Sequence, residues 1–393
     1  MGDLNMTKRF VLLGASGSIG TQTIDVILQH PDRFSLTAFG VGRRIETARK
    51  LLGIFPVTKV SVMRKEDAET LAAEFPHTKF LWGEAGMEEL ASGSDYDVLI
   101  NALVGFAGFA PTLAAMKAHH DVALANKETL VCGGALIKKA MQEYGVRLYP
   151  IDSEHSAIWQ CLQGNQMKQV KRLIITCSGG AFRDKKREEL AHVTLEDALA
   201  HPNWSMGPKI TVDCANLMNK GFEVTEAHWL FDLPYEQIDV LMHRESVIHS
   251  MVEYCDHSVM AQLGAPDMRL PIQYAMSWPD RLPLHQDHPL DLSEIGTLHF
   301  EKPDTERYPL LALAYEAGKK GGNLGAIMNA ANEAANAAFR RHEIPFLSIE
   351  QIVIDTVHHA PFAELSSVDD LIQADAWGRA YAEEQIRGVL INE

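Results

Sequence analysis

Short apolar runs alternate with amphipathic stretches from Arg9 to about Tyr149, and this alternation constrains the fold more than any other feature of the sequence. The runs are apolar at nearly every position, which is typical of strands buried on both faces, and the stretches between them have helical spacing. Strands joined by helical crossovers form a doubly wound parallel sheet. The expected strands are Phe10–Leu13, Ser35–Val41, Lys59–Val62, Val98–Ile100, Val122–Leu124 and Arg147–Ile151.

The rest of the chain predicts a second α/β region followed by helices. An apolar run at Arg172–Thr176 and the alternating segment Ser246–Leu263 indicate further strands, the latter antiparallel. Later stretches have helical spacing, and an Ala-rich run among them permits the close packing of a small bundle. The expected helices are Leu310–Ala317, Gly325–Arg340, Ser348–His358 and Ser367–Val389, with serine caps at Ser348 and Ser367.

These patterns divide the chain of 393 residues into four parts. The first part, residues 1–151, holds the parallel sheet, and residues 152–279 form the second α/β domain. Residues 280–308 are rich in Pro, Asp and His without periodicity, which indicates a linker. Residues 309–393 form the helical bundle.

The balance of charge argues against two classes of partner. A formal net charge of −16 repels the phosphate backbone of nucleic acids and the anionic face of a membrane. An anionic small substrate would need a local basic pocket that overrides this field. The apolar stretch Val98–Met116 contains Asn101, Gly105 and Pro111, so a strand, a turn and a helix start explain it better than a membrane span.

Cysteine usage and the N-terminus indicate a reducing compartment. The five cysteines are scattered, odd in number and without a CxxC pair, so neither a disulfide framework nor a structural zinc site is indicated. The first residues lack the basic region, apolar stretch and cleavage site of a signal peptide. We therefore expect a cytoplasmic protein.

A glycine-rich turn follows the first expected strand. Gly14, Gly17 and Gly20 precede an amphipathic helix, so backbone N–H groups at the helix start can hold a pyrophosphate, as in a Rossmann-like domain. The second strand ends at Arg43 and Arg44, where an NAD site has an acidic residue, and two guanidiniums favour the 2′-phosphate of NADP. A turn without a ligand and solvated surface arginines are the alternatives.

Two carboxylates follow the last strand of the first region. If this segment is extended, Asp152 and Glu154 face the same side, and their mutual repulsion favours a hard divalent cation, Mg²⁺ or Mn²⁺, between them. A third carboxylate from elsewhere in the chain would complete the ligands. Alternatively, these are surface acids, or Asp152 or Ser153 caps the helix that follows.

Features that bind phosphate gather between Cys177 and Glu223. Ser178 with two following glycines offers a hydroxyl and backbone N–H groups, and Asn219 with Lys220 offers an amide and an ammonium group. Between them, Trp204 and Met206 lie among Pro and Gly residues, which suggests a lid that excludes water. Ordinary loop turns and a packing loop are the alternatives.

Taken in order, these segments resemble the 1-deoxy-D-xylulose 5-phosphate reductoisomerase family of the non-mevalonate isoprenoid pathway. The resemblance covers essentially the whole chain and is densest from Asn126 to Arg269. It rests on GASGSIG, Asn126-Lys127-Glu128, IDSEH, SGGAFR, HPNWSMG, MNKGFE, SVIHSMV and AQLGAPDMR. The resemblance implies a homodimer with an N-terminal NADPH-binding domain, a catalytic domain, a linker and a C-terminal helical bundle.

The resemblance also implies residue roles. The metal ligands are Asp152, Glu154 and Glu223, with Glu226 beside them, and these ligands form the catalytic set with Lys127, close to the reacting hydroxyls. The residues that bind the substrate and its phosphate or form the lid are Ser153, Ser178, His201, Trp204, Met206, Cys214, Asn219 and Lys220. The NADPH contacts are Ser16, Gly17, Ser18, Ile19, Gly42, Arg43, Arg44, Asn126 and Glu128.

The implied reaction converts 1-deoxy-D-xylulose 5-phosphate, a sugar phosphate, into 2-C-methyl-D-erythritol 4-phosphate. A retro-aldol and aldol rearrangement gives an aldehyde that NADPH reduces, while Mg²⁺ or Mn²⁺ acts as a Lewis acid on the substrate oxygens. Lys127 and Glu154 are the candidates for moving protons.

The sequence departs from the family at a few positions. Cys214 stands where a serine is usual among the phosphate ligands, and a thiol is a weaker donor. Cys177 replaces a frequent glycine, and Ala15-Ser16 replaces Ser-Thr. Two other functions stay open: a metal-dependent NADP dehydrogenase that acts without rearrangement, and a catalytically inactive NADP sensor.

Overall fold

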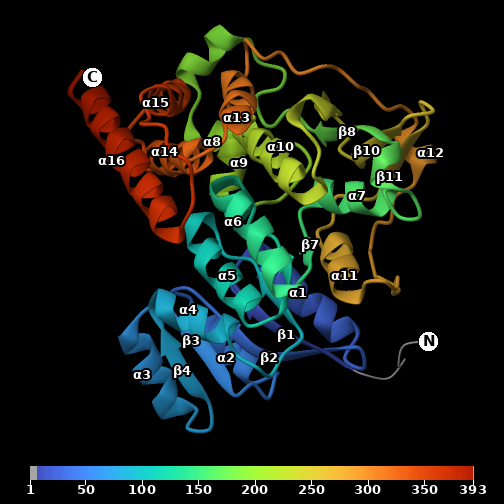
Figure 1. Cartoon of the computed structure of the whole chain (residues 1–393), viewed down its shortest axis with the longest axis vertical. Helices are drawn as coiled ribbons and strands as arrows, with labels where there is room; N and C mark the ends of the chain where they lie inside the picture. Colours follow the sequence, from blue (N-terminus) through green and yellow to red (C-terminus); the bar gives the residue numbers. More distant parts are fainter. Residues whose placement is uncertain (1–6, 393) are drawn as a thin grey trace. The chain divides into compact units, whose positions relative to one another are not determined.

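The computed structural model describes residues 7–392, which form two compact units (Figure 1). The first unit comprises the residues up to Thr129, Ile137–Ser156 and Asp267–Gln286. The second comprises Leu130–Leu136, Ala157–Pro266 and the residues from Asp287 onward. The chain therefore passes between the units several times. The fourfold division at residues 151, 279 and 308 stays a prediction.

The first unit is built on a seven-stranded parallel sheet with strand order β4-β3-β2-β1-β5-β6-β7. This confirms the doubly wound, Rossmann-like prediction. The order reverses between β1 and β5, and such a reversal opens a ligand crevice at the carboxyl ends of the two strands. The strands are β1 (Lys8–Leu13), β2 (Phe34–Gly40), β3 (Lys59–Val62), β4 (Lys79–Trp82), β5 (Val98–Asn101), β6 (Asp121–Leu124) and β7 (Leu148–Pro150).

Helices connect these strands, and most are short. Helix α11 comes from a distant part of the chain and packs on α1, where Arg269 forms an ion pair with Asp25 at 2.9 Å. The helices are α1 (Ser18–Gln29), α2 (Ile45–Leu52), α3 (Lys65–Glu74), α4 (Gly83–Ala91), the 3₁₀ turn η1 (Gly105–Gly108), α5 (Phe109–Lys117) and α11 (Arg269–Ser277). Helices α6 (Glu128–Tyr144) and α7 (Ser153–Cys161) have residues in both units.

The expected strands of this sheet are confirmed, but β4 was missed. It has only four residues, and Trp82 at its end is exposed, so it lacks a long apolar run. The apolar stretch that begins at Val98 is a strand, a turn and a helix start, as predicted. Within residues 7–392, no helix has the length and apolar character needed to cross a membrane.

The turn between β1 and α1 depends on two of its three glycines. Gly14 has a φ of +83°, and a Cβ there would lie 2.3 Å from the carbonyl oxygen of Ala102. A Cβ on Gly20 would lie 2.2 Å from the carbonyl oxygen of Gly14. Gly17 is exposed, and a Cβ there would lie 3.4 Å from the carbonyl oxygen of Gly14, an ordinary contact distance. Gly14 and Gly20 therefore shape the turn, and Gly17 is open to a ligand.

The second unit contains a four-stranded sheet and a helical bundle. The sheet has strand order β11-β10-β8-β9, with β10 antiparallel to β8 and β11 and with β9 parallel to β8. The antiparallel segment predicted at Ser246–Leu263 is confirmed as β10 and β11, whereas β9 was missed. The strands are β8 (Val170–Cys177), β9 (Ile238–Met242), β10 (Ile248–Tyr254) and β11 (Val259–Leu263).

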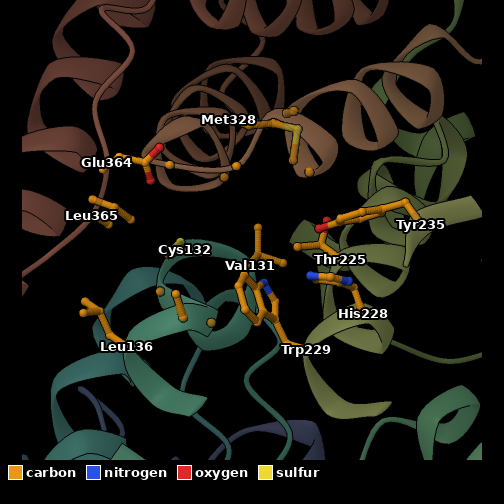
Figure 2. Close-up of a pocket in the computed structure, with 18 residues that line it drawn as sticks. Val131, Cys132, Leu136, Thr225, His228, Trp229, Tyr235, Met328, Glu364 and Leu365 are labelled. Atoms are coloured by element: carbon orange, nitrogen blue, oxygen red, sulfur yellow. The ribbon is translucent and has the colours of Figure 1, made fainter. Parts of the chain in front are cut away.

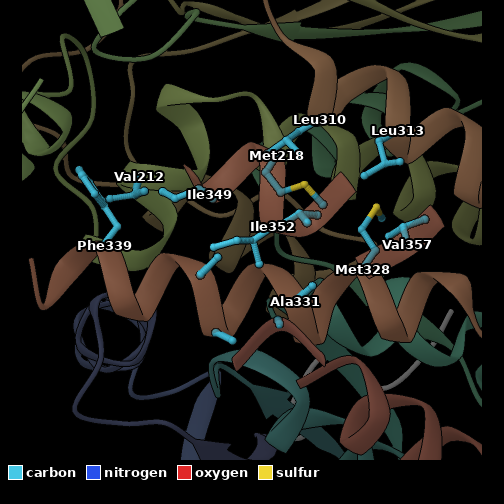
Figure 3. Close-up of a cluster of buried hydrophobic side chains, with 14 of the residues drawn as sticks. Val212, Met218, Leu310, Leu313, Met328, Ala331, Phe339, Ile349, Ile352 and Val357 are labelled. Atoms are coloured by element: carbon cyan, nitrogen blue, oxygen red, sulfur yellow. The ribbon is translucent and has the colours of Figure 1, made fainter. Parts of the chain in front are cut away.

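Helix α14 lies at the centre of the bundle, in contact with α9, α13, α15 and α16 (Figure 1 and Figure 3). Buried apolar side chains from these helices form one core, which Val212 of α9 enters beside Phe339 and Ile349. The helices are α8 (Leu195–Leu199), α9 (Pro208–Ala215), α10 (Met218–Phe231), α12 (Leu292–Ile295), α13 (Pro309–Lys320), α14 (Leu324–Arg340), α15 (Phe346–His358) and α16 (Val368–Asn392), with 3₁₀ turns η2 (Met167–Gln169), η3 (Arg187–His192) and η4 (Tyr235–Gln237).

The predicted helices of the bundle are confirmed, but only one of the two serine caps is. The Ser367 hydroxyl accepts from the backbone N–H of Asp370 at 3.1 Å, and the Asp370 carboxylate accepts from the N–H of Ser367 at 2.9 Å. The prediction of a cap at Ser348 is wrong, because α15 begins at Phe346 after Pro345. Phe346 is buried in the core, so apolar packing, rather than the serine two residues later, sets where this helix begins.

We expect Gly20→Ala to lower the free energy of unfolding by about 1–3 kcal/mol, because the added methyl group meets backbone that cannot move away cheaply. Urea denaturation of the purified chain measures this loss. Gly388→Ala in α16 is the matched control, since nothing lies within 4 Å of its Cβ position. Equal stability of the two variants would contradict the role assigned to Gly20.

Candidate active site

The candidate cofactor residues lie at the carboxyl ends of strands in the first unit. The backbone N–H of Gly17 donates to the carbonyl of Gly14 at 3.0 Å, and Gly17 precedes the first turn of α1. Arg44 donates to the carbonyl oxygen of Ser16 at 3.0 Å, so the guanidinium lies beside the glycine turn. Arg43 and Arg44 are both exposed. The first unit thus places two cations next to a helix start, an arrangement that suits a phosphorylated dinucleotide.

Asn126 holds the loop after β5 through its own hydrogen bonds. Its amide nitrogen donates to the carbonyls of Leu103 and Gly105 at 3.0 and 2.9 Å, and to Glu128 at 3.2 Å. Its amide oxygen accepts from the backbone N–H and the hydroxyl of Thr129 at 3.0 and 2.5 Å. Because protein groups occupy both ends of this amide, its side chain holds the loop after β5 in place.

Lys127 and Asp152 form a buried ion pair in the first unit. The Lys127 ammonium donates to Asp152 Oδ2 at 2.8 Å, and the His155 Nδ1 lies 2.9 Å from Oδ1. Burial raises the pKa of Asp152, but the Lys127 ammonium and the His155 ring outweigh burial and hold the pKa well below its ordinary value. Asp152 is therefore a carboxylate at neutral pH.

The extended geometry expected for Asp152 and Glu154 is wrong. Strand β7 ends at Pro150, and Asp152 precedes helix α7, where its Oδ1 accepts from the backbone N–H of Glu154 at 3.0 Å. The capping alternative is therefore correct for Oδ1, while Oδ2 binds Lys127. Glu154 lies in the first turn of α7, and its carboxylate accepts from Ser153 Oγ. Helix capping, rather than strand alternation, fixes the direction of these acids.

In the second unit, helix α10 brings the NKG segment next to Glu223. Asn219 Nδ2 donates to Glu223 Oε1 at 2.6 Å, and the Lys220 ammonium donates to Oε2. Glu223 and Glu226 are each 1% exposed. The spacing of three and four residues along one helix accounts for these contacts. A buried carboxylate, an amide and an ammonium group thus share one helix face.

Ser178 and His201 meet in the second unit. His201 Nδ1 accepts from the backbone N–H groups of Asn203 and Trp204 at 3.2 and 3.0 Å, so the proton of the neutral ring lies on Nε2, 3.0 Å from Ser178 Oγ. Burial, together with the cations Arg183 and Lys220, lowers the pKa of His201 to about 4. A neutral His201 therefore joins the base of the predicted lid to the predicted phosphate-binding loop at residues 178–180, called the phosphate loop below.

The glycine loop after β8 rests on the end of α9. Gly180 has a φ of +69°, and a Cβ there would lie 2.4 Å from the carbonyl oxygen of Cys214. Cys214 is half-buried in the last turn of α9, and Asn216 just beyond it accepts from the N–H of Met218 at the start of α10. The loop, α9 and α10 therefore bring the predicted phosphate residues together within this unit.

The predicted lid is docked on β10. Trp204 Nε1 donates to Ser246 Oγ at 2.9 Å, and the Trp204 ring lies 5.8 Å from that of His249. Trp204 and Met206 are half-buried. Helix α9 begins after Gly207, so the lid is continuous with this helix.

Sequence reasoning missed two residues of the second unit. His249 is buried on β10, and burial lowers its pKa to about 4. Arg183 donates to the carbonyls of Ser178 and Arg244 at 3.1 and 3.0 Å, and so stabilises the phosphate loop. Both lie in the segments SVIHSMV and SGGAFR, which carried the resemblance, but no motif chemistry singled out either residue.

A cavity of about 250 Å³ also lies in the second unit, on another face of α10. Figure 2 shows Thr225, His228 and Trp229 of α10 around it, with Val131 and Met328 from other helices. None of the residues predicted for the active site lines this cavity. It is therefore separate from the candidate site.

Comparisons with known proteins cover nearly all of this chain. Residues 10–134 match the sequence profile described as 1-deoxy-D-xylulose 5-phosphate reductoisomerase, and residues 148–231 and 263–381 match profiles of C-terminal domains of that enzyme. A Bacillus anthracis protein named 1-deoxy-D-xylulose 5-phosphate reductoisomerase 2 is 55% identical over 379 residues, which cover 96% of this chain and 100% of that protein. The chain belongs to the 1-deoxy-D-xylulose 5-phosphate reductoisomerase family.

Other members of this family agree in sequence and in structure. A relative from Geobacillus sp. (strain WCH70) is 52% identical over 95% of this chain and 98% of its own length. The Zymomonas mobilis enzyme in complex with NADPH is 39% identical, with a TM-score of 0.90 over 97% of this chain and 99% of that chain. A reductoisomerase crystallised with NADPH, fosmidomycin and magnesium is 36% identical, with a TM-score of 0.92 over 97% of this chain and 98% of that chain.

We expect replacement of Arg43 and Arg44 together by Ser to raise the KM for NADPH at least about tenfold, since loss of a charge-assisted hydrogen bond costs about 1.5–3 kcal/mol. The KM for NADH should change little, because NADH lacks the 2′-phosphate. Steady-state kinetics with both cofactors measure the difference. An equal rise for NADPH and NADH would reject the 2′-phosphate role.

Acid should destabilise the protein through His201. The unfolded chain protonates this ring near pH 6.5, whereas the folded chain protonates it only near pH 4, so falling pH favours unfolding between these values. In His201→Asn, the thermal midpoint should therefore fall less between pH 6.5 and pH 4 than in the wild type. His77→Asn, which removes an exposed ring, should retain the wild-type slope. Identical slopes in all three proteins would contradict the protonation state assigned to His201.

Proposed function

We propose that this chain is an NADPH- and divalent-metal-dependent oxidoreductase that converts 1-deoxy-D-xylulose 5-phosphate into 2-C-methyl-D-erythritol 4-phosphate. One observation carries the proposal: 55% identity to a protein named as a reductoisomerase, over 96% of this chain and 100% of that protein. The solved relatives bound to NADPH and magnesium support both cofactors.

Asp152, Glu154 and Glu223 are proposed as the ligands of one Mg²⁺ or Mn²⁺ ion. Their donor atoms are carboxylate oxygens, which suit a hard cation. Asp152 is charged at neutral pH, and helix capping holds it rigidly. When bound, the ion supplies Lewis-acid polarisation of the substrate oxygens. Glu226, buried one turn after Glu223 on α10, is proposed to lie beside these ligands.

The substrate phosphate is proposed to bind to residues of the second unit. Ser178 and Asn219 offer hydrogen bonds, and Lys220 supplies the positive charge that an acidic chain must provide locally. Neutral His201 donates to Ser178 and so orients its hydroxyl. Binding energy from the phosphate orders the lid and excludes water from the reacting carbons. The full proposed set is Ser153, Ser178, His201, Trp204, Met206, Cys214, Asn219 and Lys220.

NADPH is proposed to bind at the carboxyl end of the parallel sheet. The N–H groups at the start of α1 face the pyrophosphate, and Arg43 and Arg44 bind the 2′-phosphate. Asn126 holds the loop after β5 that backs Gly14. The proposed contacts are Ser16, Gly17, Ser18, Ile19, Gly42, Arg43, Arg44, Asn126 and Glu128.

Lys127 is proposed to hold or move a proton at its ammonium group, next to the reacting hydroxyls. The ion pair with Asp152 fixes the position of this group, and burial restricts the access of water. Glu154 is the second candidate for proton transfer, because it carries a carboxylate two residues from Asp152, the partner of Lys127.

We propose that the chain is divided into four parts with separate roles. Residues 1–151 bind NADPH, residues 152–279 hold the metal and the substrate phosphate, residues 280–308 are a linker, and residues 309–393 form the helical bundle.

The protein is proposed to be a cytoplasmic homodimer. Edge strand β11 supports self-association, since Val259 and Met260 are 49% and 50% exposed on it. Sedimentation equilibrium at twice 43.6 kDa would support the dimer.

The function is tested by NADPH oxidation in the presence of 1-deoxy-D-xylulose 5-phosphate. We expect turnover that a chelator abolishes and that added Mg²⁺ or Mn²⁺ restores. Product analysis by NMR separates this function from its alternative, because only a reductoisomerase forms a branched carbon skeleton. A linear product would instead indicate a dehydrogenase, and an absence of turnover with metal present would contradict the proposal.

Glu223→Gln should lower kcat by more than about a hundredfold and leave the Kd for NADPH nearly unchanged, because it removes a metal ligand without altering the parallel sheet. Stopped-flow kinetics and fluorescence titration with NADPH measure the two effects. Glu384→Gln on the exposed side of α16 is the control and should behave as the wild type. Full activity of Glu223→Gln would remove this residue from the metal site.

A further inference from the structure

We propose that Asn332 and Asn336 of α14 are positioning residues for the substrate phosphate, acting through Asp213 of α9. No motif of the chain contains this contact, and neither asparagine belongs to the proposed active site. The inference rests on the proposed function to the extent that α9 and its neighbours hold the phosphate.

Asp213 is a buried carboxylate that faces two amides and one ammonium group. It is 2% exposed, and its Oδ1 accepts from Asn332 Nδ2 at 3.0 Å and from Asn336 Nδ2 at 2.8 Å. The Lys209 ammonium, one turn earlier on α9, lies 3.1 Å from Oδ2. The charge of Asp213 is therefore balanced within α9, and the two amides come from a helix more than a hundred residues away.

The amide of Asn336 is itself held in one orientation. Its oxygen accepts from Arg340 Nε at 2.8 Å, which leaves Nδ2 directed to Asp213 and to the carbonyl oxygen of Lys209 at 3.0 Å. Asn332 and Asn336 are both fully buried. Alanine would fill these two buried positions of α14 without placing a polar group in the core, so packing alone does not explain the two amides.

We infer that the two amides fix the orientation of α9. The core around Val212, Phe339 and Ile349 joins α9 to the bundle through apolar contacts (Figure 3). Such contacts have no preferred direction, so they fix the rotation of α9 less sharply than hydrogen bonds do. Hydrogen bonds to a carboxylate require defined distances and angles, so the two amides fix the rotation of α9 about its axis.

The rotation of α9 matters because the phosphate residues flank it. Cys214 follows Asp213 directly, and the carbonyl of Cys214 closes against Gly180 of the phosphate loop. The lid leads into α9 at Gly207, and Asn216 leads out of it to α10 with Lys220. A rotation of α9 about its axis would therefore shift the phosphate loop, the lid and the start of α10 together. The amides add donors without adding a net charge near the phosphate.

The test compares Asn336→Leu with Asn329→Leu. The first removes both hydrogen bonds of Asn336 to α9, whereas Asn329 is equally buried on α14 but donates to Glu333 at 3.1 Å and not to α9. In Asn336→Leu we expect the KM for 1-deoxy-D-xylulose 5-phosphate to rise at least about tenfold, as for the loss of hydrogen bonds to a charged group. The KM for NADPH should stay within about twofold, because that site lies in the other unit. Asn329→Leu should change neither KM.

Each result decides the inference. A lower Tm with an unchanged substrate KM in Asn336→Leu, or equal effects in the two variants, would make the contact merely structural and overturn the proposal. If Asn336→Leu does not fold, Asn332→Ser removes one bond only and should give a smaller rise in the same KM; no rise would overturn the proposal.

The inference can fail independently of the proposed function. If the wild type does not turn over the substrate, the proposed function is wrong, and binding of inorganic phosphate measured by calorimetry then replaces the KM. Weaker phosphate binding in Asn336→Leu than in Asn329→Leu would still support the positioning role. Equal binding in both variants would overturn it.

Discussion

The pairing of buried carboxylates with lysines is the interaction on which this structure depends. Asp152 lies against Lys127, Glu223 against Lys220, and Asp213 against Lys209. Removal of one partner of a buried ion pair costs about 3–5 kcal/mol, because it leaves an uncompensated charge in the interior. Asp152 and Glu223 are proposed metal ligands. In each of these two pairs, the lysine compensates the negative charge of an acid that is proposed to bind a divalent ion.

The local placement of lysines also resolves the contrast between an acidic chain and an anionic substrate. A net charge of −16 repels a sugar phosphate at long range, but salt screens that repulsion over about 8 Å at physiological ionic strength. Lys220 and Arg183 lie close to the phosphate loop, where screening is weak, and both lower the pKa of His201. The neutral ring then joins the loop to the lid by hydrogen bonds that a protonated ring would lose.

Local patterns of the sequence were sufficient to predict the fold. Buried strands appear as apolar runs whatever their partners, so most strands of the parallel sheet and the helices of the bundle were predictable. Strands β4 and β9 were missed for a different reason than length, since β7 is shorter and was predicted. The residues at both ends of β4 are exposed, and β9 alternates buried and half-buried positions, so neither is apolar and buried at every position. The Ser348 cap was wrong because packing of Phe346 extended α15. Motif positions also gave the candidate residues, whereas the direction of Asp152 and Glu154 depends on a helix cap that strand alternation does not describe.

The contacts between Asp213 and α14 could not be predicted in this way. Asn332 and Asn336 belong to an Ala-rich helical pattern that indicates only close packing, and their partner lies far away in the sequence. Nothing local marks such a pair. The same holds for Arg183 and His249, whose roles follow from the loop and the strand that they contact.

Electron paramagnetic resonance of Mn²⁺ tests the central claim most directly, because it counts bound ions without any need for turnover. We expect one tightly bound Mn²⁺ per chain in the wild type, with an affinity at least about tenfold weaker in Asp152→Asn and in Glu223→Gln. Binding of the same stoichiometry and affinity in all three proteins would show that these buried carboxylates do not hold the ion.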